Sequence, residues 1–304
     1  MSSTTLPEAG RMRSTPRRPP TGRRKRGRQV GRRLLLHGIV IAGLFIMLYP
    51  LFWMFSSSFK PGSIIFTSNE LWPFDDFTLE NYVNGWNGLG IESFSTFFVN
   101  SFIIAGLCVI GNIFACSVTA YAFARLEFPG RRVLFAIMLG TLMLPYHVQL
   151  IPQYVLFSEL GWVNTFLPMV VPKYLATDAF FIFLMVQFIR GLPQGLTEAA
   201  RLDGCGHIGI FLRIVVPLCA PAIGTTAVFT FLYSWNDFLT PLIYLTTPDN
   251  YTAPLGLRLF LDITGDAAYG SLFAMSILSL VPLIGFFIAF QRTLVRGIAT
   301  TGIK

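Results

Sequence analysis

The sequence predicts an all-α membrane protein with six transmembrane helices. Of its 304 residues, 53% are hydrophobic and only 12% are charged, and the mean hydropathy is +0.61. A soluble domain has about 25% charged residues, so this composition is typical of a bilayer protein. A spanning helix needs about 20 mostly apolar residues. Six segments meet this requirement, at 34–59, 97–124, 133–156, 166–189, 218–246 and 271–290.

Residues 1–33, before the first span, are predicted to be a disordered basic tail in the cytoplasm. The tail holds many of the 23 Lys and Arg residues, with Pro and Gly scattered among them. A segment of this kind cannot bury a core and is expected to contact anionic lipid head groups. No aromatic residue interrupts it to stack on a base, so a nucleic-acid partner is not expected despite the net charge of +8.

The charges between the spans predict the orientation of residues 34–304, which form a single transmembrane domain. Short loops that are rich in Lys and Arg stay in the cytoplasm. Basic residues gather after the second, fourth and sixth spans, at Arg125, Arg131, Arg132, Arg190, Arg201, Arg213, Arg292, Arg296 and Lys304. Acidic residues fill the alternate loops, at Glu70, Asp75, Asp76, Glu80, Glu92, Glu159, Asp249, Asp262 and Asp266. Both termini are therefore predicted to be cytoplasmic.

A polar segment between the fourth and fifth spans, at about 190–217, has its own helical pattern. Its apolar residues Ile208, Phe211, Leu212 and Val215 fall at i, i+3, i+4 and i+7, which places them on one helix face. Gly204 can take the left-handed conformation that ends a preceding short helix. The small side chains of Ala199 and Ala200 would let another backbone approach closely. The segment therefore predicts two short helices that pack against a partner.

Residues 196–217 resemble the coupling loop of ABC importer permeases. The resemblance is carried by Glu198-Ala199-Ala200, Asp203-Gly204 and Pro217. From about residue 34 onward, the chain resembles the maltose type of carbohydrate permease. The supporting motifs are Thr78-Leu79-Glu80-Asn81-Tyr82, Asn100-Ser101, the 120–130 segment AYAFARLEFPG and Trp235-Asn236-Asp237.

This resemblance implies the ABC importer permease fold and a location in the bacterial plasma membrane. The implied partners are a homologous second permease, which completes a heterodimer, an ATPase dimer, an extracytoplasmic solute-binding protein and a carbohydrate substrate. The residues expected to contact the ATPase are Leu196, Glu198, Ala199, Ala200, Asp203, Gly204, Ile208, Phe211, Leu212 and Val215. A second contact is expected from the C-terminal tail, at Gly302, Ile303 and Lys304.

The chain shows no pattern of an enzyme or of a metal site. None of its four lysines, Lys25, Lys60, Lys173 and Lys304, lies in a phosphate-binding loop motif. ATP hydrolysis is therefore assigned to a partner chain, which would hold ATP and Mg²⁺, and no cofactor is expected here. The histidines are scattered and no cysteine pair has metal-ligand spacing, so no metal is expected.

Polar residues within the spans are candidates for the solute path, because a polar group in a bilayer must face a cavity or a partner. The candidates are Asp178, Tyr233, Trp235, Asn236, Asp237 and Thr240. The Trp235 ring offers a face on which a sugar could pack. Lys173 and Asp178 are about 140° apart on a regular helix and are not expected to pair. Contacts between helices are the favoured alternative for Asn112, Gln149 and Gln187.

Other functions remain open at this point. An ABC permease could carry glycerol phosphate or another small polar solute instead of a sugar. A phosphorylated cargo would attract cationic side chains, however, and Lys173 is the one such residue within the spans, which favours a neutral sugar. A secondary transporter driven by an ion gradient would use buried carboxylates, and Asp178 and Asp237 are available.

Overall fold

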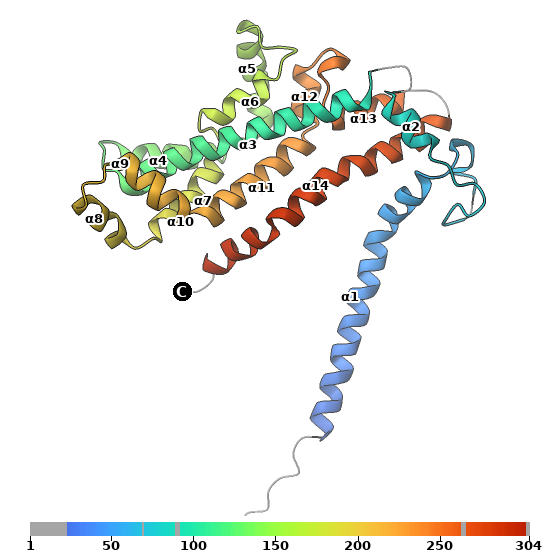
Figure 1. Cartoon of the computed structure of the whole chain (residues 1–304), viewed down its shortest axis with the longest axis horizontal. Helices are drawn as coiled ribbons and strands as arrows, with labels where there is room; N and C mark the ends of the chain where they lie inside the picture. The colour runs from blue at the N-terminus through green and yellow to red at the C-terminus, as the bar shows by residue number, and fades with distance from the viewer. Residues whose placement is uncertain (1–22, 69, 89–91, 263–265, 302–304) are drawn as a thin grey trace, which may run out of the picture. The chain divides into compact units, whose positions relative to one another are not determined.

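The computed structural model describes residues 23–68, 70–88, 92–262 and 266–301, and within these ranges every regular element is a helix (Figure 1). The predicted all-α class is therefore confirmed. The chain divides into two compact units, Met1–Phe52 and Trp53–Lys304.

The first helix, α1 (Arg23–Ser57), begins earlier than the sequence predicted. Residues 23–33 were assigned to the disordered tail, and the structure corrects this. No proline occurs between Pro20 and Pro50, and Arg, Lys and Gln are good helix formers, so the helix can extend from the apolar span into the basic segment. The rest of the predicted tail, residues 1–22, lies outside the described residues. Within α1, the segment Arg32–Ser57 is apolar enough to cross a membrane.

The second unit is built around one long helix, α3 (Phe94–Arg125). This helix packs against α6 (Leu167–Tyr174), α7 (Ala179–Arg190) and α11 (Ala220–Asn236). In turn, α11 packs against α14 (Asp266–Thr301), which lies beside it in Figure 1. Gly111 of α3 touches the ring of Tyr174, and a methyl group there would overlap that ring. Small residues thus allow close packing of the helices, as is usual in membranes.

The predicted third span is bent rather than straight. The third consists of α4 (Arg131–Thr141) and α5 (Tyr146–Glu159), which meet at 101°. Pro145 stands between them and cannot continue the hydrogen bonds of α4. The segment His207–Leu218 and α11 meet at 74°. His207–Leu218 belongs to the predicted coupling loop, so this second bend lies where the loop meets the predicted fifth span. The described residues contain four helices long and apolar enough to cross a membrane, or up to six spans if each bent pair is counted as one.

The predicted fourth and fifth spans also differ in detail from the structure. Residues 175–178 interrupt the fourth span between α6 and α7, and Ala176 there has a φ of +56°. The fifth was predicted to run to residue 246, but α11 ends at Asn236 and a separate short helix, α12 (Leu239–Tyr244), follows it.

Short elements close the bundle at the end where α3 begins. They are η1 (Gly62–Ile64), α2 (Glu80–Trp86), η4 (Pro248–Asn250) and α13 (Ala253–Asp262). Asn100 at the start of α3 donates from Nδ2 to the carbonyl oxygens of Asp249 (2.8 Å) and Tyr251 (3.0 Å). Beside it, the Ser101 hydroxyl accepts the Ala253 N–H at 2.8 Å. These contacts join the start of α3 to the segment before α13.

Candidate functional site

A polar cavity of about 590 Å³ lies among α3, α5, α6, α11 and α12. Its volume falls in the range that holds a small organic ligand. The polar side chains on its walls are Tyr146, Gln149, Gln153, Lys173, Thr177, Asp178, Tyr233, Ser234, Asp237, Thr240 and Tyr244. A second cavity, of about 440 Å³, shares part of this wall and extends toward Thr141 and Thr230.

Four of the six predicted solute-path residues line the first cavity: Asp178, Tyr233, Asp237 and Thr240. The other two, Trp235 and Asn236, do not. Asn236 is exposed and donates from Nδ2 to the carbonyl oxygen of Leu232 at 2.8 Å, one turn earlier on α11.

Trp235 is a packing residue, and the prediction that its ring receives a sugar is corrected. Its side chain is only 1% exposed, and its Nε1 donates to the Ser279 carbonyl oxygen of α14 at 3.1 Å. The ring stacks on Phe231 and meets Phe98 and Phe102 edge to face. Residues two apart on a helix are separated by about 200°, so Trp235 faces away from the cavity that Tyr233 lines.

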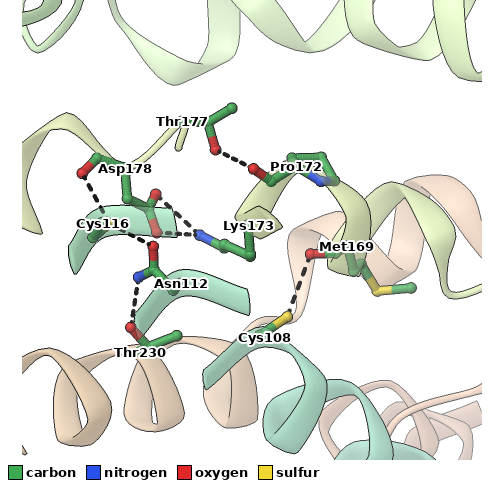
Figure 2. A network of polar contacts seen from close by, with 9 residues as sticks. All are labelled: Cys108, Asn112, Cys116, Met169, Pro172, Lys173, Thr177, Asp178 and Thr230. Carbon is green, nitrogen blue, oxygen red and sulfur yellow. Dashed lines mark hydrogen bonds and ion pairs between the residues drawn. The ribbon is translucent and has the colours of Figure 1, made fainter. Parts of the chain in front are cut away.

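Lys173 and Asp178 form an ion pair on the cavity wall (Figure 2). The Lys173 Nζ lies 2.9 Å from Oδ2 and 3.1 Å from Oδ1 of Asp178. On one regular helix the two side chains would lie about 140° apart and would not pair. The break at Ala176 turns the chain so that the two side chains point toward one another. Thr177 donates from its hydroxyl to the Pro172 carbonyl oxygen at 2.9 Å, across the same break.

The polar contacts beside the ion pair join helices, as Figure 2 shows. Asn112 of α3 is fully buried and donates from Nδ2 to the Thr230 hydroxyl of α11 at 2.8 Å. The Cys116 thiol donates to Asn112 Oδ1 at 3.1 Å. The predicted helix-joining role of Asn112 is therefore confirmed. Gln187, by contrast, is exposed on α7.

Sequence reasoning missed several cavity residues, notably those on α5. Gln149 was expected to join helices, yet it lines the cavity. Tyr146, Gln149 and Gln153 fall at i, i+3 and i+7, a polar stripe on an otherwise apolar segment, and this pattern could have identified them. Among the residues that the structure describes, no group of three or more His, Cys, Asp and Glu side chains is placed to hold a metal ion.

The predicted coupling loop contains two short helices. They are α8 (Gln194–Leu202) and α9 (His207–Ile210), and the chain continues through a π-helical turn, η3 (Phe211–Val215), into α10 (Val216–Leu218). Gly204 has a φ of +79°, which confirms the left-handed position predicted after the first helix. In Figure 1, α8 and α9 lie at the far end of α3 from α13.

The predicted apolar face of the loop divides into an exposed part and a buried part. The exposed residues are Leu196, Glu198, Ala199, Asp203, Gly204, Ile208 and Leu212. Ala200 and Val215 are buried within this chain, and Phe211 packs on the Tyr121 ring at 5.3 Å. Within this chain, α3 and α7 therefore cover Ala200 and Val215, and Phe211 is half-buried against them. Leu202, which was not predicted, is 90% exposed.

The predicted tail contact, Gly302, Ile303 and Lys304, lies outside the described residues. Within them, two arginines join the ends of α3 and α7, where the coupling loop begins. Arg125 donates from Nη2 to the carbonyl oxygens of Ile189 (2.8 Å) and Leu192 (2.7 Å). Arg190 donates back to the Phe123 carbonyl oxygen at 3.5 Å and lies over the Phe135 ring. The sequence analysis had used both arginines only to assign the orientation.

Comparison with known proteins gives consistent results. Residues 111–300 match the family described as the binding-protein-dependent transport system inner membrane component. The arabinooligosaccharides transport system permease protein AraQ of Halalkalibacterium halodurans is 35% identical over 262 residues, which are 86% of this chain and 92% of that protein. The trehalose/maltose transport system permease protein MalG of Thermococcus litoralis is 33% identical over 272 residues, 89% of this chain and 96% of that protein.

A solved structure shows the same fold. One chain in the crystal structure of a bacterial ABC transporter involved in the import of the acidic polysaccharide alginate matches with a TM-score of 0.77 at 22% identity, covering 91% of this chain and all of that chain. The sequence matches and the shared helical fold lead to one assignment: the chain belongs to the family of binding-protein-dependent transport system inner membrane components, which are multi-pass membrane proteins of ABC importers.

Proposed function

We propose that this chain is one membrane subunit of an ATP-driven importer for a neutral sugar or oligosaccharide. The observation that carries the proposal is that α7 connects the cavity to the coupling loop. Asp178, on the cavity wall, immediately precedes α7, and Arg190 ends it just before α8. At 1.5 Å per residue the two are about 18 Å apart. A displacement of the loop by a partner therefore reaches the cavity wall through one short helix.

The exposed part of the coupling loop supports an ATPase partner. Leu196, Leu202, Ile208 and Leu212 are between 45% and 90% exposed. Each such side chain contributes about 1.5–3 kcal/mol when a partner buries it completely. The exposed carboxylates of Glu198 and Asp203 would add polar contacts at the same surface. ATP and Mg²⁺ stay on the partner, and closure of the ATPase dimer moves α8 and α9.

The cargo and the remaining partners are assigned by the cavity and by the relatives. The cavity walls carry hydroxyl, amide and carboxylate groups, which suit the hydroxyl groups of a sugar. Both reported relatives are named as sugar transport permeases. The solute arrives from an extracytoplasmic binding protein and passes between this subunit and a homologous second permease. The basic residues near α8 support a cytoplasmic location for that end of the molecule and for both termini, because short loops rich in Lys and Arg stay in the cytoplasm.

The test is uptake into proteoliposomes that contain this chain, its second permease and its ATPase, with the binding protein outside. Labelled arabinotriose, maltotriose and sn-glycerol 3-phosphate are compared with and without ATP. We expect ATP-dependent uptake of a neutral sugar. Uptake without ATP would instead indicate an ion-coupled transporter, and preferential uptake of the phosphate ester would overturn the neutral cargo.

A charge reversal tests the coupling loop in the same vesicles. Glu198→Lys is expected to reduce uptake at least tenfold without loss of membrane insertion, because an ammonium group then replaces the exposed carboxylate and repels or misaligns the ATPase. Glu159→Lys is the matched control, since Glu159 ends α5 and its side chain is also exposed. Normal uptake and ATPase association in Glu198→Lys would contradict the coupling role.

A further inference from the structure

The two cavities share one stretch of wall. The residues that line both are Tyr146, Gln149, Lys173, Thr177, Asp178 and Tyr233. A solute in either cavity can therefore contact the Lys173–Asp178 ion pair. The two side chains remain 29% and 23% exposed, so they are accessible from the cavities.

The charges on these walls are few and unequal. Lys173 contributes one positive charge, and Asp178 and Asp237 contribute two negative charges, which leaves a net charge of −1 among the lining residues. The two carboxylates have different partners. Asp178 holds Lys173 with both oxygens, whereas Asp237 accepts the Thr240 backbone N–H at 3.1 Å. Only Asp178 thus neutralises the cation directly.

The pairing decides which solutes the shared wall can hold. An unpaired ammonium in a cavity of low dielectric would attract an anion strongly. Once paired, it no longer does so, but the pair still hydrogen-bonds. The ammonium has three donors, of which the carboxylate uses two, and the carboxylate keeps free lone pairs. A group that both donates and accepts, such as a sugar hydroxyl, fits this arrangement.

We propose that Asp178 is a specificity-determining residue, which holds the Lys173 ammonium so that the shared wall accepts uncharged polyhydroxy solutes and rejects anionic ones. The break at Ala176 makes this possible because it brings two residues of one span together. The inference rests on the proposed function for the identity of the solute class. The charge relation itself is a property of the cavity and can be measured without any solute.

The experiment measures the electrostatic potential in the cavity through the reactivity of a single cysteine thiol. Gln149→Cys, which lines both cavities together with the pair, is placed in a variant whose four native cysteines are replaced, within the complete transporter. The labelling rates of an anionic reagent, sulfonatoethyl methanethiosulfonate, and of uncharged hydroxyethyl methanethiosulfonate are compared. In Asp178→Asn we expect the anionic rate to rise about tenfold relative to the uncharged one, because Lys173 is released.

Two further variants distinguish the effect of breaking the ion pair from the effect of changing the net charge of the cavity. Asp237→Asn changes the net charge by the same amount but leaves the pair intact, so its effect should be less than about threefold. The double variant Lys173→Gln/Asp178→Asn restores the net charge of −1 and should return the ratio to the parental value. An equal response of Asp178→Asn and Asp237→Asn, or no response of Asp178→Asn, would overturn the proposal.

A third variant covers the case in which Asp178→Asn fails to assemble. Lys173→Gln leaves the Asp178 carboxylate unpaired and should lower the relative anionic rate about tenfold, and an unchanged ratio would also overturn the proposal. Where the complex imports a neutral sugar, alginate trisaccharide should inhibit uptake by Asp178→Asn but not by the parent. Labelling needs neither cargo nor ATP, so a transporter that fails in the uptake assay contradicts the proposed function without affecting this result.

Discussion

At the scale of single residues, Asn164 joins two loops that are far apart in the sequence. Its Oδ1 accepts the backbone N–H groups of Thr246 (3.0 Å) and Thr247 (3.2 Å), and its own N–H donates to the Tyr244 carbonyl oxygen at 2.7 Å. Asn250 donates to the Asn164 carbonyl oxygen at 2.9 Å. The residue has a φ of +61°, a conformation that asparagine adopts more readily than most residues.

Asn164→Leu is expected to lower the free energy of unfolding by about 2–4 kcal/mol. The substitution removes the side-chain hydrogen bonds, and leucine tolerates the left-handed backbone conformation less well than asparagine does. The measurement is thermal unfolding of the purified complex in detergent. Asn164→Gly keeps the backbone conformation but removes the side chain, so it should fall between the parent and Asn164→Leu. Equal melting temperatures for the parent and Asn164→Leu would contradict this account.

Which individual residues face the cavity was only partly predictable. The polar character of α11 identified Tyr233, Asp237 and Thr240, because unpaired polar groups in a span are costly. It could not separate them from Trp235 and Asn236, since that requires the rotation of α11 against α3 and α14. The Lys173–Asp178 pair was missed for a different reason: a left-handed alanine leaves no signal in the sequence, whereas a left-handed glycine such as Gly204 does.

At the scale of helices, the reciprocal arginine contacts fix α7 to α3 where the coupling loop begins. The forked guanidinium of Arg125 reaches two carbonyl oxygens, at the end of α7 and just beyond it. Those carbonyls lie at the negative end of the helix dipole, where a cation is favourable. The contact therefore makes α3 and α7 respond together when the loop is displaced.

Arg125→Lys is expected to raise the number of ATP molecules hydrolysed per solute imported about threefold or more. A lysine keeps the charge but lacks the planar fork, and one hydrogen bond to a charged group contributes about 1.5–3 kcal/mol. The ratio of ATP hydrolysis to uptake in proteoliposomes measures the effect. Arg132→Lys is the control, because its side chain is exposed at the start of α4. An unchanged ratio in Arg125→Lys, at normal assembly, would refute the linkage.

The helices themselves were largely predictable, and their interruptions were not. Long apolar runs predicted six spans, because hydropathy over about 20 residues is a strong signal, and the structure has between four and six candidates, depending on whether each bent helix pair is one span. The bend at Pro145 could be expected from the proline, whereas the end of α11 at Asn236 depends on packing that no local pattern encodes. The amphipathic character of the segment that forms α9 and η3 was predicted from its apolar spacing. Its division between core and solvent required knowledge of where α3 and α7 lie.

At the scale of the whole molecule, the coupling surface is an exposed apolar area beside a well-packed core. Val215 and Ile210 are almost completely buried, while Leu202 and Ile208 in the same loop are 90% and 76% exposed. The buried residues stabilise the permease itself, and the exposed ones are available to a partner. The all-α fold class followed from hydropathy, whereas the cavity did not.

Leu202→Ser is expected to weaken association with the ATPase about tenfold, since it removes one large apolar side chain from the contact, about 1.5 kcal/mol. The folded permease should be unaffected. Affinity between the purified ATPase and the permease pair in nanodiscs provides the measurement. Leu160→Ser, at the end of α5, serves as the control because Leu160 is also exposed. Undiminished affinity in Leu202→Ser would mean that the ATPase binds elsewhere.

The interruption at residues 175–178 has a mechanical consequence. Because α6 and α7 are separate helices divided by a non-helical segment, a tilt of α7 about its first residue need not break the backbone hydrogen bonds within α6. With a lever arm of about 18 Å, a tilt of about 10° carries the Arg190 end through roughly 3 Å. The Lys173–Asp178 ion pair bridges the interruption, so a movement of a few ångströms at the loop would appear as a small rotation beside the cavity.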